Sequence, residues 1–145
     1  MIHDVTLGAK LTLTAATLAY GFGPFITDMN KTHLTHPAWT GHARFHLLWA
    51  SLSQLAISAI ALWLIWREDV RSAGNCALAA VIGLCMTSGF FGALIFKRVF
   101  NGTLHDPKGI PPLWGKVDGN LIAVTIIDGL LIWGWALLPA ATNSA

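Results

Sequence analysis

Histidines are the residues of this sequence with the clearest chemistry, and four of the six fall within the fourteen positions 33–46. His42 and His46 lie four residues apart at the start of a long apolar stretch, and Thr40 is a suitable N-cap for a helix that begins there. Side chains at this spacing project from one face of a helix. Two imidazoles on one face can bind a transition metal together, so the pair predicts a metal site.

The polar segment before this helix adds further candidate ligands, because His33 and His36 lie in it and Asp28 offers a carboxylate nearby. Imidazole with carboxylate suits zinc or non-haem iron better than calcium or magnesium, which prefer oxygen ligands alone. Histidines in a polar loop at the level of the lipid headgroups need no metal, however, and His36 could be a turn residue beside Pro37. The predicted metal ligands are Asp28, His33, His36, His42 and His46.

Two other polar features lie near these candidates in the sequence. Arg44 stands between His42 and His46, where it could pair with an acidic residue, help to hold a cofactor, or reach a lipid phosphate as arginines at helix ends do. His105 and Asp106 lie in a second polar segment, and they could add a ligand or an acid–base pair or form only a solvated turn.

Asp128 is the second chemical signal, since it lies about ten residues inside an apolar stretch, where an ionisable group is costly. Tyr20, Gln54 and Ser88 fall at similar depth in the other apolar stretches, so the four could share one polar layer. We expect Asp128 to act as an acid–base or substrate-orienting group, with Tyr20 and Gln54 as the other catalytic candidates. The alternative is that Asp128 only holds helices together through hydrogen bonds.

The elements that must position these residues are four apolar stretches. The chain has 145 residues, of which 54% are hydrophobic and 11% are charged, and its mean hydropathy of +0.60 is far from that of a soluble domain. The charges are clustered, which leaves four windows near the length that crosses a bilayer. We therefore predict an all-α integral membrane protein, a single domain over residues 1–145 formed by a bundle of four transmembrane helices at about 11–26, 45–66, 73–96 and 119–138.

The connections between these stretches predict the orientation. Segments 27–44 and 97–118 are long and lie on one side, with six basic residues against three on the other side, so the positive-inside rule places both long loops in the cytoplasm. We expect a bacterial cytoplasmic membrane and no cleaved signal peptide. Small residues at four-residue spacing should allow close helix packing, and they are Ala15, Ala19 and Gly23 in the first span with Gly89 and Ala93 in the third.

The four spans, the segment Arg44-Phe45-His46 at the start of the second, and the motif Asn101-Gly102 followed by Pro111-Pro112, Gly115 and Asp118 resemble styrene oxide isomerases. In that family haem acts as a Lewis acid that opens an epoxide within the membrane, and a histidine of the second span is its axial ligand. The resemblance implies haem b as cofactor and His46 as that ligand.

The sequence departs from that pattern because it adds His33, His36 and His42, which one axial haem bond does not need. The added histidines favour a non-haem site. His42 and His46 also match the His-x-x-x-His element of membrane desaturases and hydroxylases, although the further histidine boxes of those enzymes are missing.

Together these features predict a metal- or haem-dependent membrane enzyme that isomerises or oxidises a small lipophilic substrate arriving from the lipid bilayer. The metal would lie at the cytoplasmic mouth of the bundle with a polar pocket beneath it. We expect no nucleic-acid partner, and a homo-oligomer with the site near a subunit interface, because four helices enclose little volume. The alternative function is non-catalytic: a small transporter, a metal carrier or an accessory subunit.

Overall fold

The computed structural model describes residues 5–105, 112–113 and 115–139, and within these ranges the chain forms four helices. Their bounds are α1 (Leu7–Asp28), α2 (Gly41–Trp66), α3 (Ser72–Phe96) and α4 (Gly119–Ala136). Side-chain oxygens start three of them, because Thr6, Thr40 and Asp118 accept a hydrogen bond from a backbone N–H of the first turn of α1, α2 and α4. The predicted all-α class, the positions of the four helices and the Thr40 N-cap are therefore confirmed.

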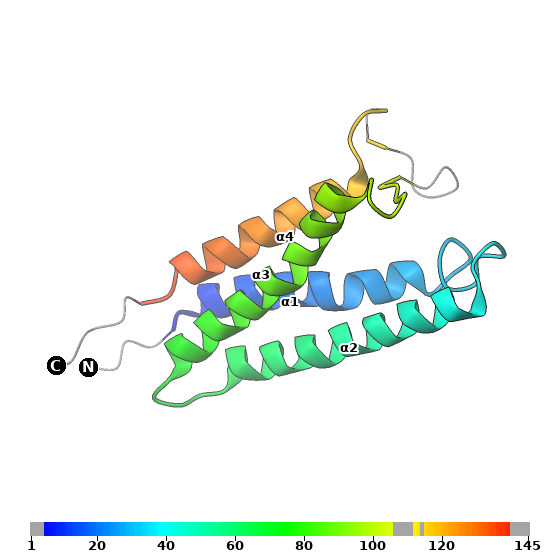
Figure 1. Ribbon diagram of the computed structural model, residues 1–145. Helices are drawn as coiled ribbons and strands as arrows, with labels where there is room; N and C mark the ends of the chain where they lie inside the picture. The colour runs from blue at the N-terminus through cyan, green and yellow to red at the C-terminus, as the bar shows by residue number, and fades with distance from the viewer. Residues whose placement is uncertain (1–4, 106–111, 114, 140–145) are drawn as a thin grey trace.

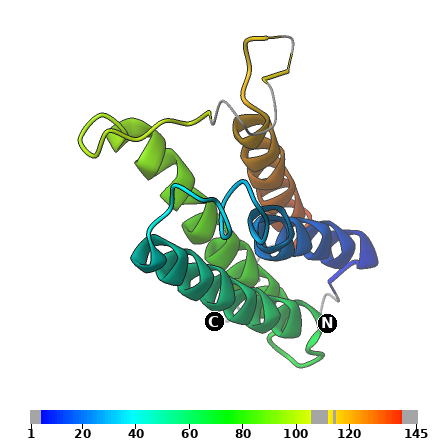
Figure 2. The same cartoon turned by 90° about the vertical axis from the view of Figure 1, so that its right-hand side faces the viewer.

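The helices run up and down in chain order and lie side by side (Figure 1). The start of α1, the short turn 67–71 and the end of α4 lie at one end of the bundle, which we call the turn end. The segment 29–40 and the described residues between α3 and α4 (97–105, 112–113 and 115–118) lie at the other end, which we call the loop end. Helix α1 packs against all three other helices, whereas α2 and α4 are diagonal to each other and share no contact (Figure 2).

The turn end is closed by contacts between α1 and the end of α2. The amine of Lys10 lies 3.7 Å from a carboxylate oxygen of Glu68 and 5.6 Å from the ring centroid of Trp66. The indole N–H of Trp66 donates a hydrogen bond of 3.0 Å to the hydroxyl of Thr14. These contacts give the buried Lys10 a negative partner and an aromatic face, so its position in the first apolar stretch is compatible with a membrane.

The packed core fills only the half of the bundle near the turn end. Buried apolar residues such as Leu13, Ile65 and Leu131 lie in that half. The other half, toward the loop end, has no buried residue in any of the four helices. The last buried residues are at position 21 in α1 and 87 in α3, and the first are at position 51 in α2 and 127 in α4. The helices diverge toward the loop end, as both views show (Figures 1 and 2).

Helices α2, α3 and α4 are long and apolar enough to cross a membrane, and their outward faces carry large apolar side chains. Helix α1 is not among these candidate spans. The structure therefore confirms three of the four predicted membrane-compatible helices. Four tryptophans near the turn end are exposed, as expected of an interfacial belt; they are Trp63, Trp66, Trp133 and Trp135.

The predicted small-residue contacts of the first span are wrong in their register. Ala15 and Ala19 are exposed, and a Cβ atom at Gly23 would meet nothing within 4 Å. The close approach to α2 is made instead at Gly21, where a Cβ atom would overlap the hydroxyl of Ser58 and lie 2.5 Å from the Ser58 Cβ. In the third span, Gly89 likewise has open space and Ala93 is exposed.

Gly21→Ala is therefore expected to destabilise the protein, because the added methyl group must push α1 away from α2. Overpacking of this kind costs about 1–3 kcal/mol, which outweighs the gain of at most about 1 kcal/mol from replacing glycine in a helix. The measurement is thermal unfolding of detergent-purified protein. Gly23→Ala on the same helix is the matched control and should be neutral or slightly stabilising. Equal melting temperatures for the two variants would contradict the observed contact.

Candidate functional site

The His42–His46 pair lies on the first two turns of α2. The two Nε2 atoms are 3.0 Å apart, and the rings are nearly perpendicular, with centroids separated by 4.4 Å. If both nitrogens bind one metal ion at about 2.05 Å, this separation corresponds to an N–metal–N angle of about 94°. The pair can therefore act as a two-nitrogen chelate with little rearrangement, or one ring can donate a hydrogen bond to the other.

The pair faces away from the bundle. His42 and His46 are both exposed, and so are the aromatic side chains of Phe45 and Trp49 beside them. The centroid of the His46 ring lies 6.1 Å from that of Phe45 and 5.8 Å from that of Trp49. The four side chains form an outward-facing aromatic stripe near the start of α2, at the depth expected for a membrane interface.

His33 lies in the loop after α1, close to the carboxylate that the sequence analysis paired with it. Its Nδ1 is 3.7 Å from Asp28 Oδ1 and 2.8 Å from the hydroxyl of Thr32. That hydroxyl also lies 2.6 Å from Asn30 Oδ1, which can only accept, so Thr32 donates to Asn30 and accepts from Nδ1–H of His33. This tautomer leaves Nε2 of His33 free to bind a metal.

His36 takes part in building the loop. Its Nδ1 accepts a hydrogen bond of 3.2 Å from the backbone N–H of Ala38, so Nε2 carries the proton in the neutral ring. The guanidinium of Arg44 donates a hydrogen bond of 2.9 Å to the carbonyl of His36. Both residues thus have structural roles here, and the turn-residue interpretation of His36 agrees with this geometry.

The predicted ligands form two separate pairs, Asp28 with His33 and His42 with His46. Within the part of the chain that the structure describes, no group of three or more His, Cys, Asp or Glu side chains converges on one point. At the same end, His105 Nδ1 lies 3.9 Å from a carboxylate oxygen of Asp118, while Asp106 lies outside the described residues. The five-ligand site remains a prediction, and the geometry supports its His42–His46 half.

The interior polar layer begins with a proline inside α1. Pro24 has no N–H, so it cannot make the helical hydrogen bond to the carbonyl of Tyr20. The side-chain amide of Gln54 donates to that carbonyl from α2. Sequence reasoning assigned Gln54 to catalysis and missed this role, although Pro24 within the first apolar stretch was a signal for it.

Asp128 accepts a hydrogen bond from the buried hydroxyl of Thr87, which joins α3 and α4. The predicted member of the layer on α3, Ser88, is wrong, because it is exposed and its hydroxyl donates to the carbonyl of Cys85. Tyr20 is buried, and its hydroxyl has no hydrogen-bond partner among the described residues. Asp128, Tyr20 and Gln54 do lie in the middle of the bundle, as predicted.

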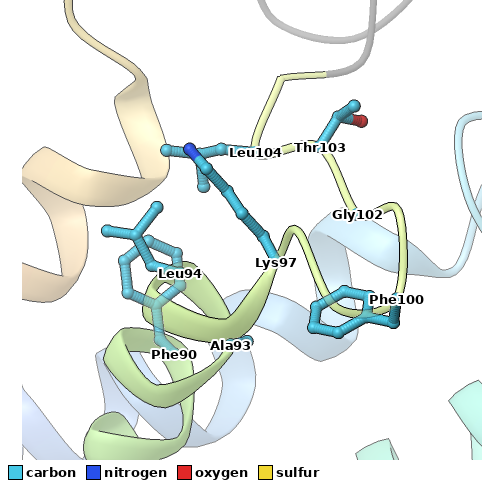
Figure 3. A pocket seen from close by; sticks show the side chains of 8 residues that line it. All are labelled: Phe90, Ala93, Leu94, Lys97, Phe100, Gly102, Thr103 and Leu104. Atoms are coloured by element: carbon cyan, nitrogen blue, oxygen red, sulfur yellow. The ribbon is translucent and has the colours of Figure 1, made fainter.

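The two polar regions are separate. Asp128 is on α4, which does not contact α2, and the histidine pair points outward from α2. A third feature, a pocket of about 130 Å³, lies between the end of α3 and the loop that follows it (Figure 3). Its lining is apolar apart from Lys97 and Thr103 and includes neither histidines nor Asp128; it consists of Phe90, Ala93, Leu94, Lys97, Phe100, Gly102, Thr103 and Leu104.

Comparison with known proteins gives one match. Residues 12–106, more than half of the chain, match the model of a family of unknown function, DUF6640. This stretch includes the histidine-rich loop, the His42–His46 pair, Tyr20, Gln54 and Thr87, but not Asp128. No curated protein and no solved structure matches the chain.

The role of Gln54 can be tested with a double-mutant cycle. Gln54→Leu should lower the free energy of unfolding by about 1–3 kcal/mol, because it leaves the Tyr20 carbonyl without a partner. In a Pro24→Ala background the backbone N–H at position 24 can bond to that carbonyl, so the same substitution should cost clearly less. Thermal unfolding of the four proteins measures the coupling. Equal costs in the two backgrounds would contradict the structural role.

Proposed function

Because this chain belongs to the DUF6640 family, whose function is unknown, we propose a function from its own geometry: a membrane-embedded, metal- or haem-dependent enzyme that acts on a small lipophilic substrate. The observation that carries the proposal is the 3.0 Å separation of the Nε2 atoms of His42 and His46. Two neutral imidazoles held so close together could both reach one divalent transition metal ion after a small rotation of the rings.

The outward direction of the pair supports a lipophilic substrate. Exposed Phe45 and Trp49 surround the histidines, so a bound metal ion would have its open coordination positions toward the bilayer interface. A substrate dissolved in the lipid could reach those positions without passing through the bundle. The metal would polarise the substrate oxygen as a Lewis acid, which serves epoxide opening, or exchange electrons, which serves oxidation.

If the cofactor is haem, His46 would hold its iron in this proposal, and His42 would support His46. Phe45 and Trp49 flank His46 with exposed aromatic faces, which suits contact with a flat macrocycle. Arg44 is directed to the His36 carbonyl, so the geometry favours a structural over a cofactor-binding role for its guanidinium.

The interior residues have a supporting role in this proposal. Gln54 and Asp128 each take part in a hydrogen bond between helices, and neither lies beside the histidine pair. The hydroxyl of Tyr20 is buried in the packed half and has no hydrogen-bond partner among the described residues. The sequence predicted a metal site at the mouth of the bundle with a polar pocket beneath it. The proposed site lies instead on the outer face of α2.

We also propose that α1 crosses the membrane with the other three helices and that the loop end faces the cytoplasm. A 22-residue helix is about 33 Å long, enough to span the hydrocarbon layer. Helix α1 packs against the three other helices, and two of its polar residues, Lys10 and Thr17, are buried among them. Its composition thus reflects a central position in the bundle.

The topology can be tested by cysteine labelling in a Cys85→Ala background. With an impermeant reagent on intact cells, Val70→Cys at the turn end should be labelled, whereas Thr35→Cys and Val99→Cys at the loop end should react only after permeabilisation. An epitope tag placed ahead of Val5 should be accessible outside together with position 70. A tag on the same side as Thr35 would show that α1 does not cross, and the reverse labelling pattern would invert the orientation.

The metal proposal predicts that His42→Ala and His46→Ala each weaken metal or haem retention at least about tenfold, since even the loss of a residue that only supports a ligand costs that much. Elemental analysis and an absorption spectrum of detergent-purified protein measure the retention. A Soret band lost mainly with His46 identifies haem, and equal losses at both positions identify a non-haem ion.

The matched control is His36→Asn, because asparagine can still accept the hydrogen bond of the Ala38 N–H but has no imidazole. It should keep full occupancy. If His36→Asn and His33→Ala, measured as separate single variants, both lose metal, the result would support the five-ligand site and not a site made by His42 and His46 alone. Full occupancy in both His42→Ala and His46→Ala would contradict the proposal.

A further inference from the structure

The His42–His46 pair is half of a metal site, and the direction in which it points determines where the rest must come from. Both rings are exposed on the outward side of α2, so the space around their common point is bounded by this chain on one side only. Structural zinc sites are almost always four-coordinate, and catalytic zinc sites have three protein ligands, so two nitrogens are too few for either kind of site. Within the described residues no third ligand joins the pair.

We infer that a second copy of this chain supplies the same two histidines, so that one metal ion on a two-fold axis is bound by four imidazoles. This inference rests on the proposed metal function and adds to it the ligand set and the partner. The two imidazoles of the second copy would take two of the coordination positions that one pair leaves open, and a metal ion with more than four positions would keep the others for the substrate.

Symmetry in a membrane favours this arrangement. Two copies in one bilayer have the same orientation, so the axis of a symmetric dimer is parallel to the membrane normal, and each residue meets its counterpart at equal depth. If the outward face of α2 lies at the axis, His42 and His46 of one copy necessarily face His42 and His46 of the partner. Ligands from facing helices are a usual way to build metal sites in helical bundles.

The chelate geometry fits such a centre. The angle of about 94° that each pair can offer lies between the about 90° of a square-planar and the about 109° of a tetrahedral centre. The angle at which the two α2 helices cross would decide between the two. The site therefore accepts Cu²⁺, Ni²⁺ or Zn²⁺, all of which bind neutral imidazole.

The surface around the pair suits a second copy of a membrane helix. Phe45, Trp49 and Leu52 are exposed along the same side of α2, and no residue of α2 before Ser51 is buried. Apolar side chains at an interface within the bilayer need no desolvation of charged groups, so the association depends on packing and on the metal bonds. Removal of the metal should therefore separate the copies.

The test uses the full chain, purified in detergent and stripped of metal with a chelator. Addition of Zn²⁺ or Cu²⁺ alone should convert a monomer to a dimer, measured by light scattering with correction for detergent, at one metal ion per two chains. His42→Ala and His46→Ala should each abolish both the metal binding and the dimer. His36→Asn should retain them, and circular dichroism should confirm that all variants remain helical.

A second readout does not depend on the stability of the dimer. In a Cys85→Ala background, Phe45→Cys should form an intermolecular disulfide under oxidising conditions only when Zn²⁺ is present, because the two-fold axis brings this position close to its counterpart. Ile95→Cys is the matched control, since it is equally exposed but lies on α3.

The outcomes separate this inference from the proposed function. One metal ion per monomer, or haem bound to a monomer through His46, would overturn the shared site and leave the proposed function intact. A dimer that persists in the His42→Ala/His46→Ala double variant would also overturn the shared site. Failure of every metal and of haem to bind would overturn both.

Discussion

A polar backbone group inside a membrane helix must find its partner within the protein, and the carbonyl of Tyr20 is where this constraint acts most strongly on the chain. Pro24 takes away its helical partner, and Gln54 replaces it from the neighbouring helix. The bond fixes the depth of α2 against α1 one residue away from Gly21, where the two backbones come closest. The packed half of the bundle begins at this level and continues to the turn end.

The same constraint divides the polar residues of the chain into two groups. Inside the bundle, Gln54 donates to the Tyr20 carbonyl and Thr87 donates to Asp128, each across a helix contact, so their polarity stabilises the fold. Outside the packed half, His42 and His46 bond with each other and with no other side chain among the described residues, and they point away from the bundle. Chemistry on an external ligand therefore fits the outer face of α2 better than the depth of the bundle.

The elements could be predicted from the sequence because their signals are local: uncharged windows give the helices, and Thr40 gives the start of α2. The side of each helix that faces its neighbours could not be predicted in this way. In a bilayer the exterior is as apolar as the core, so apolar periodicity does not distinguish them. An error of one residue turns a side chain by about 100°, which is why Thr87 and not Ser88 reaches Asp128. The depth of Gln54 was predicted correctly, but its role as the hydrogen-bond donor to the Tyr20 carbonyl follows only when Pro24 is considered together with it.

The density of histidines predicts a site in this region, and neighbouring hydrogen bonds decide which of the rings are free to bind a ligand. His36 uses its Nδ1 to hold the loop, and Arg44 extends this loop structure by donating to the His36 carbonyl. Arg44 is two residues from both His42 and His46, which places it on nearly the opposite side of the helix from them. The loop therefore fastens the first turns of α2 from one side while the histidine pair is presented on the other. Because the loop is tied to α2 at Arg44, the backbone that carries the pair is ordered before any ligand arrives, which lowers the entropy lost when a metal binds.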